Sequence, residues 1–422
     1  MQKGIKTRFI AHEILFQLRE KNINYDEILN FNLSKHSLSF SDKKLIHTIV
    51  LTSMRHHIYV KKIISQYVLK KCNIQQYILF LSAITQIVYL NFKDYAVVNS
   101  TVELAKNRKI NIYPGFVNAV LKKIAKNRIE LKKTNIKFSD LPSWFTNNSK
   151  NFSNNAKNNF LQSILEKPNI NLVFKNQILK KLFKFKSIDT SDKSLIIENP
   201  IQIEKLPRYS NGDWWVQDYA SMLPLHLIGD LFNKAVIDMC SAPGGKSFQA
   251  ISLGAKLDLI EVSLKRAKIL KENLNRLKFN HKIKIEDALK ISNRKKYDYI
   301  LIDTPCSSVG TIRRNPEIFF RKSIPNLKSI SIIQKKLLDK ASKIVKKKGI
   351  IVYMACSFLP VETTQQINNF LEKNKNFEKD KFVMKSNKDG IIDNSGYINI
   401  IPKTLKNYNI DGFFAAKMIR ND

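Results

Sequence analysis

The second half of the chain alternates short apolar runs with basic amphipathic stretches, and this alternation limits the possible folds more than any other feature. After Trp214, five apolar runs predict strands, and two stretches with helical periodicity lie between them. Such alternation is typical of a doubly wound, largely parallel sheet. The predicted strands are Val236–Met239, Leu257–Val262, Lys282–Ile285, Tyr297–Ile302 and Ile350–Met354, and the predicted helices are Leu264–Phe279 and Ser329–Val345.

The first part of the chain has helical periodicity only. Its apolar residues recur at the spacing of one helix face, which indicates a helical bundle from Thr7 to about Arg128. The longest apolar run, Tyr77–Phe92, contains Gln86 and is shorter than the ~20 residues of a membrane span, so it predicts a buried helix. The stripes are Ile10, Ile14, Leu15 and Leu18, followed by those within Leu45–Met54, Ile78–Tyr89 and Phe116–Ile124.

The middle of the chain has a different composition. Asparagine and lysine become frequent from Leu131 to about Gly212, and a short run at Asn171–Phe174 predicts a strand. With 422 residues the chain is long enough for two to four domains. We therefore predict an all-α bundle over residues 1–131, a small α+β linker domain over 132–212 and an α/β domain over 213–422.

The chain is strongly basic. It has 72 Lys and Arg against 35 Asp and Glu, a formal net charge of +37, which favours a polyanionic partner such as nucleic acid or an acidic membrane face. Lysine is also abundant in segments that read as core, so part of this charge reflects a substitution drift along the whole chain. We expect a nucleic-acid partner, no membrane partner and a monomer.

The four cysteines are Cys72, Cys240, Cys306 and Cys356. They form no CxxC pair, and no histidine cluster has metal spacing, which argues against a zinc site, any other metal centre or a disulfide framework. Reduced thiols and an amino terminus without an apolar signal segment predict a cytoplasmic protein.

Polar residues follow each predicted strand, where open α/β sheets bind ligands. The first strand leads into a turn with two glycines after Pro243, which permits close approach of the backbone to a ligand at a helix start. A purely structural turn is the alternative, and the glycine spacing fits neither a dinucleotide fingerprint nor a P-loop. Glu261 and Asp287 follow the next two strands, at positions suited to ribose hydroxyls and an adenine amine. Each acid alone would more often be a surface charge, but together they indicate S-adenosylmethionine.

Two neighbouring strands each end near a cysteine. Asp303 and Cys306 follow the fourth strand, and Cys356 follows the fifth. A single buried cysteine is usually a small hydrophobic residue, whereas two beside a predicted cofactor site favour chemistry. A thiolate that adds to C6 of a pyrimidine makes C5 nucleophilic toward a methyl donor. Asp303 could bond the base edge, and a second group such as Cys306 could help to release the product.

These elements together resemble the RNA 5-methylcytosine methyltransferases, specifically the bacterial 16S rRNA enzymes of the RsmB, Sun or Fmu type with a NusB-like domain. The resemblance covers most of the chain. It implies a NusB-like RNA-binding bundle, an RRM-like linker and a Rossmann-like class I methyltransferase domain. The motifs that carry it are Cys240–Lys246, Asp303-x-Pro305-Cys306, Gly310-x-Ile312-Arg313-Arg314-x-Pro316, Cys356-Ser357 with Glu362, and Asp411-Gly412-Phe413-Phe414.

The resemblance also implies roles. Cys356 is the expected nucleophile and Cys306 the thiol that assists release, with Asp303 and Lys246 as further catalytic residues. The expected product is 5-methylcytosine in 16S rRNA, at cytosine 967. The residues expected to line the S-adenosylmethionine site are Cys240, Ser241, Ala242, Pro243, Gly244, Gly245, Lys246, Glu261, Asp287 and Asp303.

Three departures from the family pattern concern the cofactor, the nucleophile and the linker. Glu261 replaces the usual aspartate, Ala355 replaces a threonine before the nucleophile, and the linker domain matches poorly. A non-catalytic RNA-binding or ribosome-assembly factor with a decayed domain is therefore an alternative, although a scaffold needs neither thiol. An amino-group methyltransferase would instead have an Asp/Asn-Pro-Pro-aromatic motif.

The target cytosine must be single-stranded or flipped, because its C5 atom is hidden in a paired helix. Arg313 and Arg314 follow the Cys306 loop and are candidates for contacts with flanking phosphates. Surface solvation is their alternative role.

Overall fold

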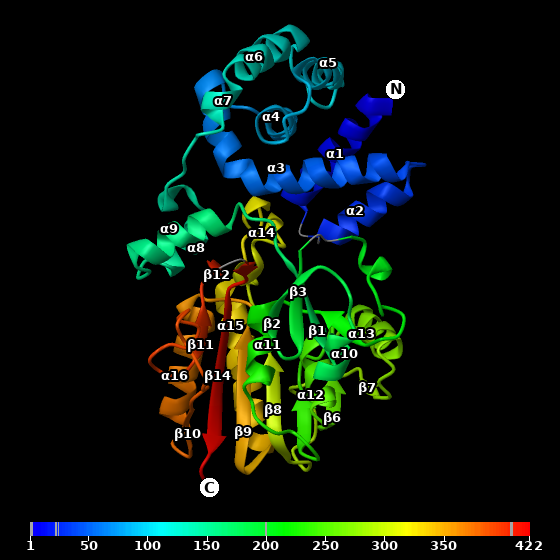
Figure 1. Cartoon of the computed structure of the whole chain (residues 1–422). Coiled ribbons are helices and arrows are strands. Elements are labelled where there is room, and N and C mark those ends of the chain that lie inside the picture. The colour runs from blue at the N-terminus through cyan, green and yellow to red at the C-terminus, as the bar shows by residue number, and fades with distance from the viewer. Residues whose placement is uncertain (1–2, 22, 24, 199–200, 406–407) are drawn as a thin grey trace. The chain divides into compact units, whose positions relative to one another are not determined.

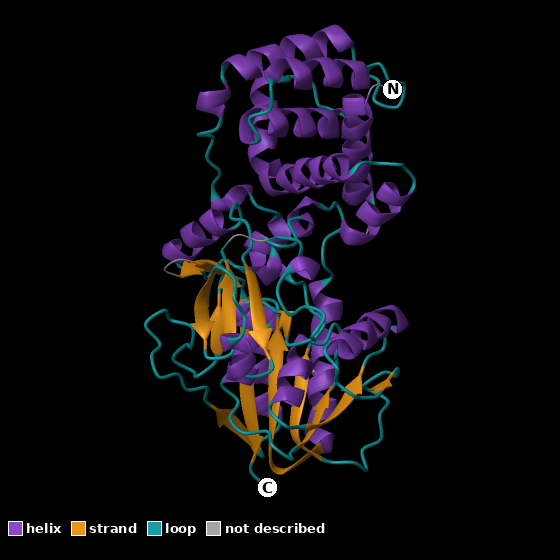
Figure 2. Cartoon of the chain, turned by 45° about the vertical axis from the view of Figure 1, so that its right-hand side comes forward, coloured by secondary structure: helices purple, strands orange, loops and turns teal. Residues whose placement is uncertain are grey.

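The computed structural model describes residues 3–21, 23, 25–198, 201–405 and 408–422. By their contacts the residues form two compact units. Unit 1 contains residues 1–150 and 312–324, and unit 2 contains residues 151–311 and 325–422. All strands among the described residues belong to unit 2 (Figure 2).

Unit 1 is a helical bundle, as the apolar stripes predict. Ile10, Ile14 and Leu15 are at most 1% exposed and lie in one core with the apolar faces of the other helices. The run Tyr77–Phe92 forms a buried helix that continues into a π-helical turn. The elements are α1 (Lys3–Glu20), α2 (Tyr25–Ser34), α3 (Phe40–Tyr67), α4 (Ile74–Ile84), η1 (Thr85–Tyr89), α5 (Asp94–Ala105), α6 (Pro114–Lys126), α7 (Arg128–Leu131), η2 (Phe138–Asp140) and α8 (Ser143–Asn148) (Figure 1).

No helix among the described residues is both long enough and apolar enough to cross a membrane.

The segment 312–324 packs with the bundle although it lies far along the sequence. Arg55 of α3 donates from Nη2 to the Arg313 carbonyl oxygen at 2.8 Å, and the Arg19 guanidinium donates to the Phe320 carbonyl oxygen. The rings of His57 and Phe320 meet edge to face, with centroids 5.5 Å apart. The helix in this segment is α14 (Glu317–Phe320).

Unit 2 contains a small antiparallel sheet, which confirms the α+β interpretation of the middle segment. Its strand order is β2-β3-β1-β4. Trp215 pairs with Val173, so the strand after Gly212 belongs to this small sheet. The elements are α9 (Asn154–Ser163), β1 (Ile170–Phe174), α10 (Gln177–Lys181), β2 (Ser187–Ser191), β3 (Ser194–Ile197), η3 (Ile203–Lys205) and β4 (Trp214–Val216).

The large sheet has the order β10-β14-β9-β8-β5-β6-β7. Strands β5 to β9 are parallel, and β14 is antiparallel to both β9 and β10. The five predicted strands and two predicted helices are all present, with ends shifted by a few residues. The strands of the large sheet are β5 (Ala235–Asp238), β6 (Lys256–Ile260), β7 (Ile283–Lys284), β8 (Tyr297–Asp303), β9 (Val345–Ala355), β10 (Phe377–Asp380), β14 (Phe413–Arg420) and β11 (Ile398–Ile400), which pairs with β14. Strands β12 (Lys403–Leu405) and β13 (Tyr408–Ile410) form a separate two-stranded sheet.

Helices cover both faces of this sheet, which confirms a doubly wound, Rossmann-like architecture. Residues such as Leu223, Phe248 and Leu270 pack in one core, and residues such as Leu337 and Ile367 pack in a second. The strand order reverses at β5, where such folds bind ligands. The helices are α11 (Tyr219–His226), α12 (Gly245–Ser252), α13 (Leu264–Arg276), α15 (Leu327–Ile344) and α16 (Thr364–Lys373), with short turns η4 (Val309–Thr311) and η5 (Pro360–Glu362).

The three domain boundaries stay a prediction. The structure differs from them at residues 132–150 and 312–324, which pack with the helical bundle. The composition of the chain changes near residues 131 and 212. The packing of distant segments and the pairing of strands do not affect composition, so the sequence could not show them.

Candidate active site

The carboxyl ends of the parallel strands bring the predicted site residues to one edge of the large sheet. Glu261 follows β6, Asp287 lies just beyond β7, Asp303 ends β8, and Cys356 follows β9. Strands β8 and β9 are direct neighbours, with Asp303 in register with Met354. The predicted adjacency of the two cysteine-bearing strand ends is therefore confirmed.

The glycine turn after β5 is held mainly by packing. Gly244 has φ +117°, and a Cβ atom there would lie 2.1 Å from the Phe248 ring. The Ser241 hydroxyl donates to the Asp238 carbonyl oxygen at 2.9 Å, and α12 begins at Gly245. The turn thus places the start of α12 beside the ends of β5 and β6.

Glu261 connects this turn to the end of β6. Its side chain is buried, with Oε2 accepting the Ala242 N–H at 3.2 Å and Oε1 accepting the Ser263 N–H at 3.0 Å. The Arg266 guanidinium lies 3.5 Å from Oε2. Oε1 accepts only the Ser263 N–H, so its second lone pair can accept a bond from a ligand hydroxyl. The extra methylene relative to aspartate does not displace the group from the turn.

Asp238 is a buried acid whose part in the site the sequence did not reveal. Its Oδ2 accepts a 2.6 Å bond from the Ser247 hydroxyl, which fixes α12 against β5. Burial raises the pKa of Asp238 to about 6, and the nearby Asp303 contributes in the same direction. The available signal was an acid at the end of an apolar run, directly before a glycine turn.

Lys246 and Asp303 form a largely buried ion pair. Lys246 Nζ lies 2.8 Å from Asp303 Oδ2, and the lysine side chain is 7% exposed. The ammonium also lies over the Phe413 ring, 5.1 Å from its centroid. Burial alone would lower the pKa of Lys246, but the charges of Asp303 and of a Cys356 thiolate outweigh it and raise the pKa. Lys246 is thus a fixed positive charge close enough to stabilise a thiolate at Cys356.

The two thiols are partners of each other. Cys306 and Cys356 are half-buried and lie close enough to affect each other's ionisation. The interaction with Cys356, together with burial and the charge of Glu362, raises the pKa of Cys306 well above that of an ordinary thiol. Cys306 is therefore the thiol that stays protonated, and Cys356 is the one that interacts with Lys246.

The residues at this edge fit an adenosylated sulfonium cofactor. Glu261 offers oxygens to ribose hydroxyls, and half-buried Asp287 can accept from an adenine amine while its Oδ1 accepts the Leu289 N–H at 3.0 Å. The Asp303 side chain is 25% exposed and has one oxygen outside the Lys246 bond. This donor set is rich in carboxylates, which suits a ligand with hydroxyls, an amine and a positive charge.

Comparison with known proteins identifies the family. Residues 230–419 match the model of the 16S rRNA methyltransferase RsmB/F family. Residues 230–419 belong to this RsmB/F family. Residues 5–126 match the NusB family, so the RsmB/F methyltransferase carries an amino-terminal NusB domain, as the resemblance implied. It is accordingly an S-adenosylmethionine-dependent rRNA methyltransferase.

Relatives match the RsmB/F chain over its full length. The ribosomal RNA small subunit methyltransferase B of Shewanella oneidensis is 27% identical over 431 residues, which cover 98% of this chain and 99% of that protein. The protein of the same name from Pectobacterium atrosepticum is 25% identical and covers 100% of both chains.

Two solved structures share the fold of the RsmB/F chain. The crystal structure of PH0851 has a TM-score of 0.73 at 18% identity over 99% of both chains. That of NSun6 from Pyrococcus horikoshii with SFG has a TM-score of 0.54 at 16% identity, over 65% of this chain and 97% of that chain.

Close passage of backbones explains two glycines of the RsmB/F motifs. The Gly310 N–H donates to the Cys356 carbonyl oxygen at 3.0 Å, and the Gly412 N–H donates to the Gly310 carbonyl oxygen at 2.8 Å. A Cβ atom on Gly310 would lie 2.0 Å from the Gly412 carbonyl oxygen. The loop after Cys306, the end of β9 and the start of β14 are thereby fixed together.

Gly310→Ala should therefore separate these backbones. We expect a loss of about 1–3 kcal/mol in the free energy of unfolding, the usual cost of overpacking, together with reduced turnover. Urea unfolding and a methyl-transfer assay measure the two effects. Gly4→Ala is the control, because its Cβ atom would lie 3.5 Å from the Arg8 side chain, an ordinary contact. Unchanged stability of Gly310→Ala would show that the loops do not need this approach.

Ala355, the departure next to the nucleophile, faces away from it. Ala355 is fully buried in the core with Tyr353 and Ile351, whereas Cys356 packs against the core on the opposite face of the sheet. Successive side chains of a strand point to opposite faces. A threonine hydroxyl at position 355 would lie on the other side of β9 from the Cys356 thiol, in the core against which Cys306 packs.

The two candidate phosphate-binding arginines lie in different environments. Arg313 is 0% exposed and packs within unit 1, whereas Arg314 is exposed. A side chain without exposed surface cannot contact phosphate in this conformation, so Arg313 has a packing role. Segment 312–324 belongs to the helical unit 1, and the sequence spacing does not encode this placement. Contact of Arg314 with RNA stays a prediction.

Unit 1 of the RsmB/F chain also has a basic groove of about 1130 Å³ between α3, α8 and the segment 312–324. Two acids, Glu20 and Asp140, line it as well, and each is in an ion pair, with Lys322 at 3.4 Å and Lys62 at 2.8 Å. Trp144 adds a half-buried aromatic surface. The six basic residues that line the groove are Arg19, Lys61, Lys70, Lys71, Arg321 and Lys322.

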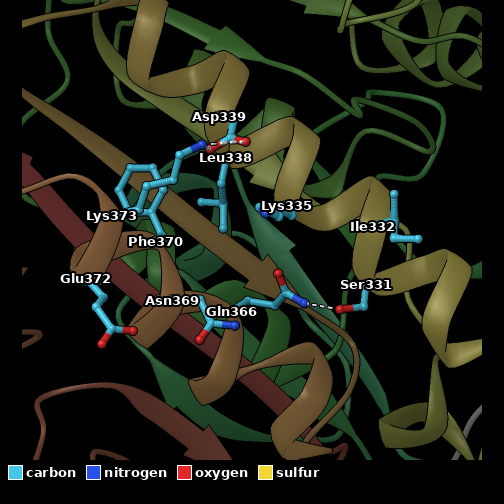
Figure 3. Close-up of a pocket in the computed structure, with 10 residues that line it drawn as sticks. All are labelled: Ser331, Ile332, Lys335, Leu338, Asp339, Gln366, Asn369, Phe370, Glu372 and Lys373. Carbon is cyan, nitrogen blue, oxygen red and sulfur yellow. Dashed lines mark hydrogen bonds and ion pairs between the residues drawn. The ribbon is translucent and has the colours of Figure 1, made fainter.

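A further groove, of about 400 Å³, lies between α15 and α16 in unit 2 (Figure 3). The Gln366 amide donates to the Ser331 hydroxyl across it, and Lys373 pairs with Asp339 at 3.2 Å. None of the predicted site residues lines this groove.

Proposed function

We propose that this RsmB/F methyltransferase methylates C5 of one cytosine of 16S rRNA, by the family resemblance cytosine 967, through a transient bond between Cys356 and C6. The observation that carries the proposal is the pair of interacting thiols at the ends of neighbouring strands, beside the Lys246–Asp303 ion pair. An RNA substrate of this kind implies that the protein acts in the cytoplasm, and we expect it to act as a monomer.

S-adenosylmethionine, held by the β5 turn, Glu261, Asp287 and Asp303, would supply an activated methyl group. Lys246 stabilises the Cys356 thiolate, and that thiolate forms a bond to C6, so that C5 becomes an enamine carbon. The Asp303 oxygen outside the lysine bond accepts from the N4 amine of the cytosine. Asp303 and Lys246 therefore hold the base and the nucleophile, respectively.

The thiol pair also supports an order of proton transfers. When the Cys356 sulfur bonds to C6 it loses its negative charge, and the largest cause of the raised pKa of Cys306 disappears. Cys306 then releases its proton to water more easily. Its thiolate accepts the proton of C5, the C5–C6 double bond returns, and the bond to Cys356 breaks to regenerate the thiolate.

One experiment tests this function. The full-length protein is incubated with S-adenosylmethionine carrying a labelled methyl group and with 16S rRNA, and the RNA is digested to nucleosides. We expect label in 5-methylcytidine at a single position. Label in an N4-methylated nucleoside would favour an amino-group methyltransferase, and absence of label would favour the scaffold alternative.

We propose that the basic groove of unit 1 binds the phosphates of the same rRNA. Its six basic side chains outnumber its two acids, of which Glu20 pairs with Lys322, one of the six, and Asp140 pairs with Lys62 outside the groove. If about six phosphates are neutralised, log affinity should fall with log salt at a slope of about −4 to −5 for single-stranded RNA. Fluorescence anisotropy over a salt series gives this slope.

A charge reversal makes this test specific. Lys70→Glu with Lys71→Glu should reduce the magnitude of the slope by about 0.7 for each lysine. The control is Lys122→Glu with Lys123→Glu, an exposed lysine pair of the same unit that does not line the groove. Equal slopes for the two double variants would assign the RNA contacts to another surface.

A further inference from the structure

Glu362 is a fully buried carboxylate between the two cysteine loops. Its Oε1 accepts the Ser307 N–H at 2.6 Å, and its Oε2 accepts the hydroxyls of Ser307 and Ser357, each at 2.5 Å. Its carbonyl oxygen accepts the Tyr353 hydroxyl at 2.6 Å. The two serines directly follow Cys306 and Cys356, so one side chain connects the residues next to both thiols.

The charges of Glu362 and Lys246 act on the thiol pair with opposite signs. Glu362 is one of the groups that disfavour a thiolate at Cys306, while Lys246 lies on the side of Cys356. The negative charge of Glu362 favours the neutral thiol at Cys306, and the positive charge of Lys246 favours the thiolate at Cys356. Four donated hydrogen bonds hold this acid in place within the protein interior.

We propose that Glu362 is a positioning residue that fixes both cysteine loops and assigns the role of nucleophile to Cys356 by keeping Cys306 protonated. The inference rests on the proposed function and deepens it. Glu362 does so without touching the cytosine, since its side chain has no exposed surface. The signal in the sequence was the repeated Cys-Ser pair, at Cys306-Ser307 and Cys356-Ser357.

The test compares alkylation rates of the two cysteines in the full-length protein. Iodoacetamide modifies thiolates, and peptide mass spectrometry gives the rate at each cysteine. In the natural protein Cys356 should react faster than Cys306. Glu362→Gln should lower the ratio of the two rates by about tenfold, which corresponds to one unit of pKa. Turnover should fall by at least about tenfold, because loss of pre-organised geometry has effects of this size.

Two further variants separate charge from structure. Glu372→Gln, the same substitution at an exposed position of α16, should leave both the ratio and turnover unchanged. Glu362→Asp keeps the charge but shortens the side chain, so it should keep the ratio within about threefold of the natural protein and still lower turnover. If Glu362→Gln does not fold, the natural protein itself is the test, because equal alkylation rates of Cys306 and Cys356 would overturn the inference.

An unchanged alkylation ratio in Glu362→Gln, or undiminished turnover, overturns the inference. A merely structural Glu362 would speed alkylation of both cysteines alike and leave the ratio constant. The ratio requires no RNA and no methyl transfer. If the natural protein did not methylate rRNA, the proposed function would be wrong. The alkylation ratio would still show whether Glu362 keeps Cys306 protonated.

Discussion

Cys306→Ala is expected to leave the protein covalently attached to its RNA. In the proposed reaction the methylated adduct must lose the proton at C5 before the bond to Cys356 can break. Cys306 is the thiol that interacts with Cys356, and the proposed reaction assigns no other group to that proton. With labelled S-adenosylmethionine and 16S rRNA, the variant should give a slowly migrating band on a denaturing gel that carries both protein and methyl label.

The double variant with Cys306→Ala and Cys356→Ala is the control for this experiment. It should give no such band, because the sulfur that bonds to C6 is absent. A variant Cys306→Ala that turns over normally without accumulating an adduct would assign proton removal to another group.

Cys356→Ala is expected to abolish methyl transfer, with turnover below about 10⁻³ of the natural protein, because the covalent route is lost. Cofactor binding should stay intact, since the predicted cofactor contacts come from β5 to β8 and Cys356 follows β9. Methyl transfer to rRNA and calorimetric titration with S-adenosylmethionine measure the two properties. Loss of cofactor affinity together with turnover would mean that Cys356 supports the cofactor site instead of attacking the base.

The sequence predicted the site best where local pattern determines position. Apolar runs locate β8 and β9, and the sheet rule then brings their ends, with Cys306 and Cys356, to the same edge. The acids at the ends of β6 and β8 follow from the same rule. These positions depend only on where each strand ends and on the order of the strands. The apolar periodicity predicts the strand ends, and the alternation of strands and helices predicts a parallel sheet.

Features that depend on long-range packing were not predictable. Arg313 was a candidate for phosphate contacts but is buried, and its segment packs with the helical bundle, which lies far from it in the sequence. Glu362 is far from Ser307 in the sequence, and only the fold places its carboxylate within 2.6 Å of that residue. The antiparallel strand β14 also escaped prediction, although its first residues, Phe413 and Phe414, were noted as a motif.

The most direct measurement of the central claim is the site of attachment in the adduct formed by Cys306→Ala. The adduct is digested with nuclease and protease, and its peptides are sequenced by mass spectrometry. The account predicts one methylated cytidine nucleotide bound to the sulfur of Cys356. Attachment at Cys240, at a residue other than cysteine, or no attached nucleotide would contradict it.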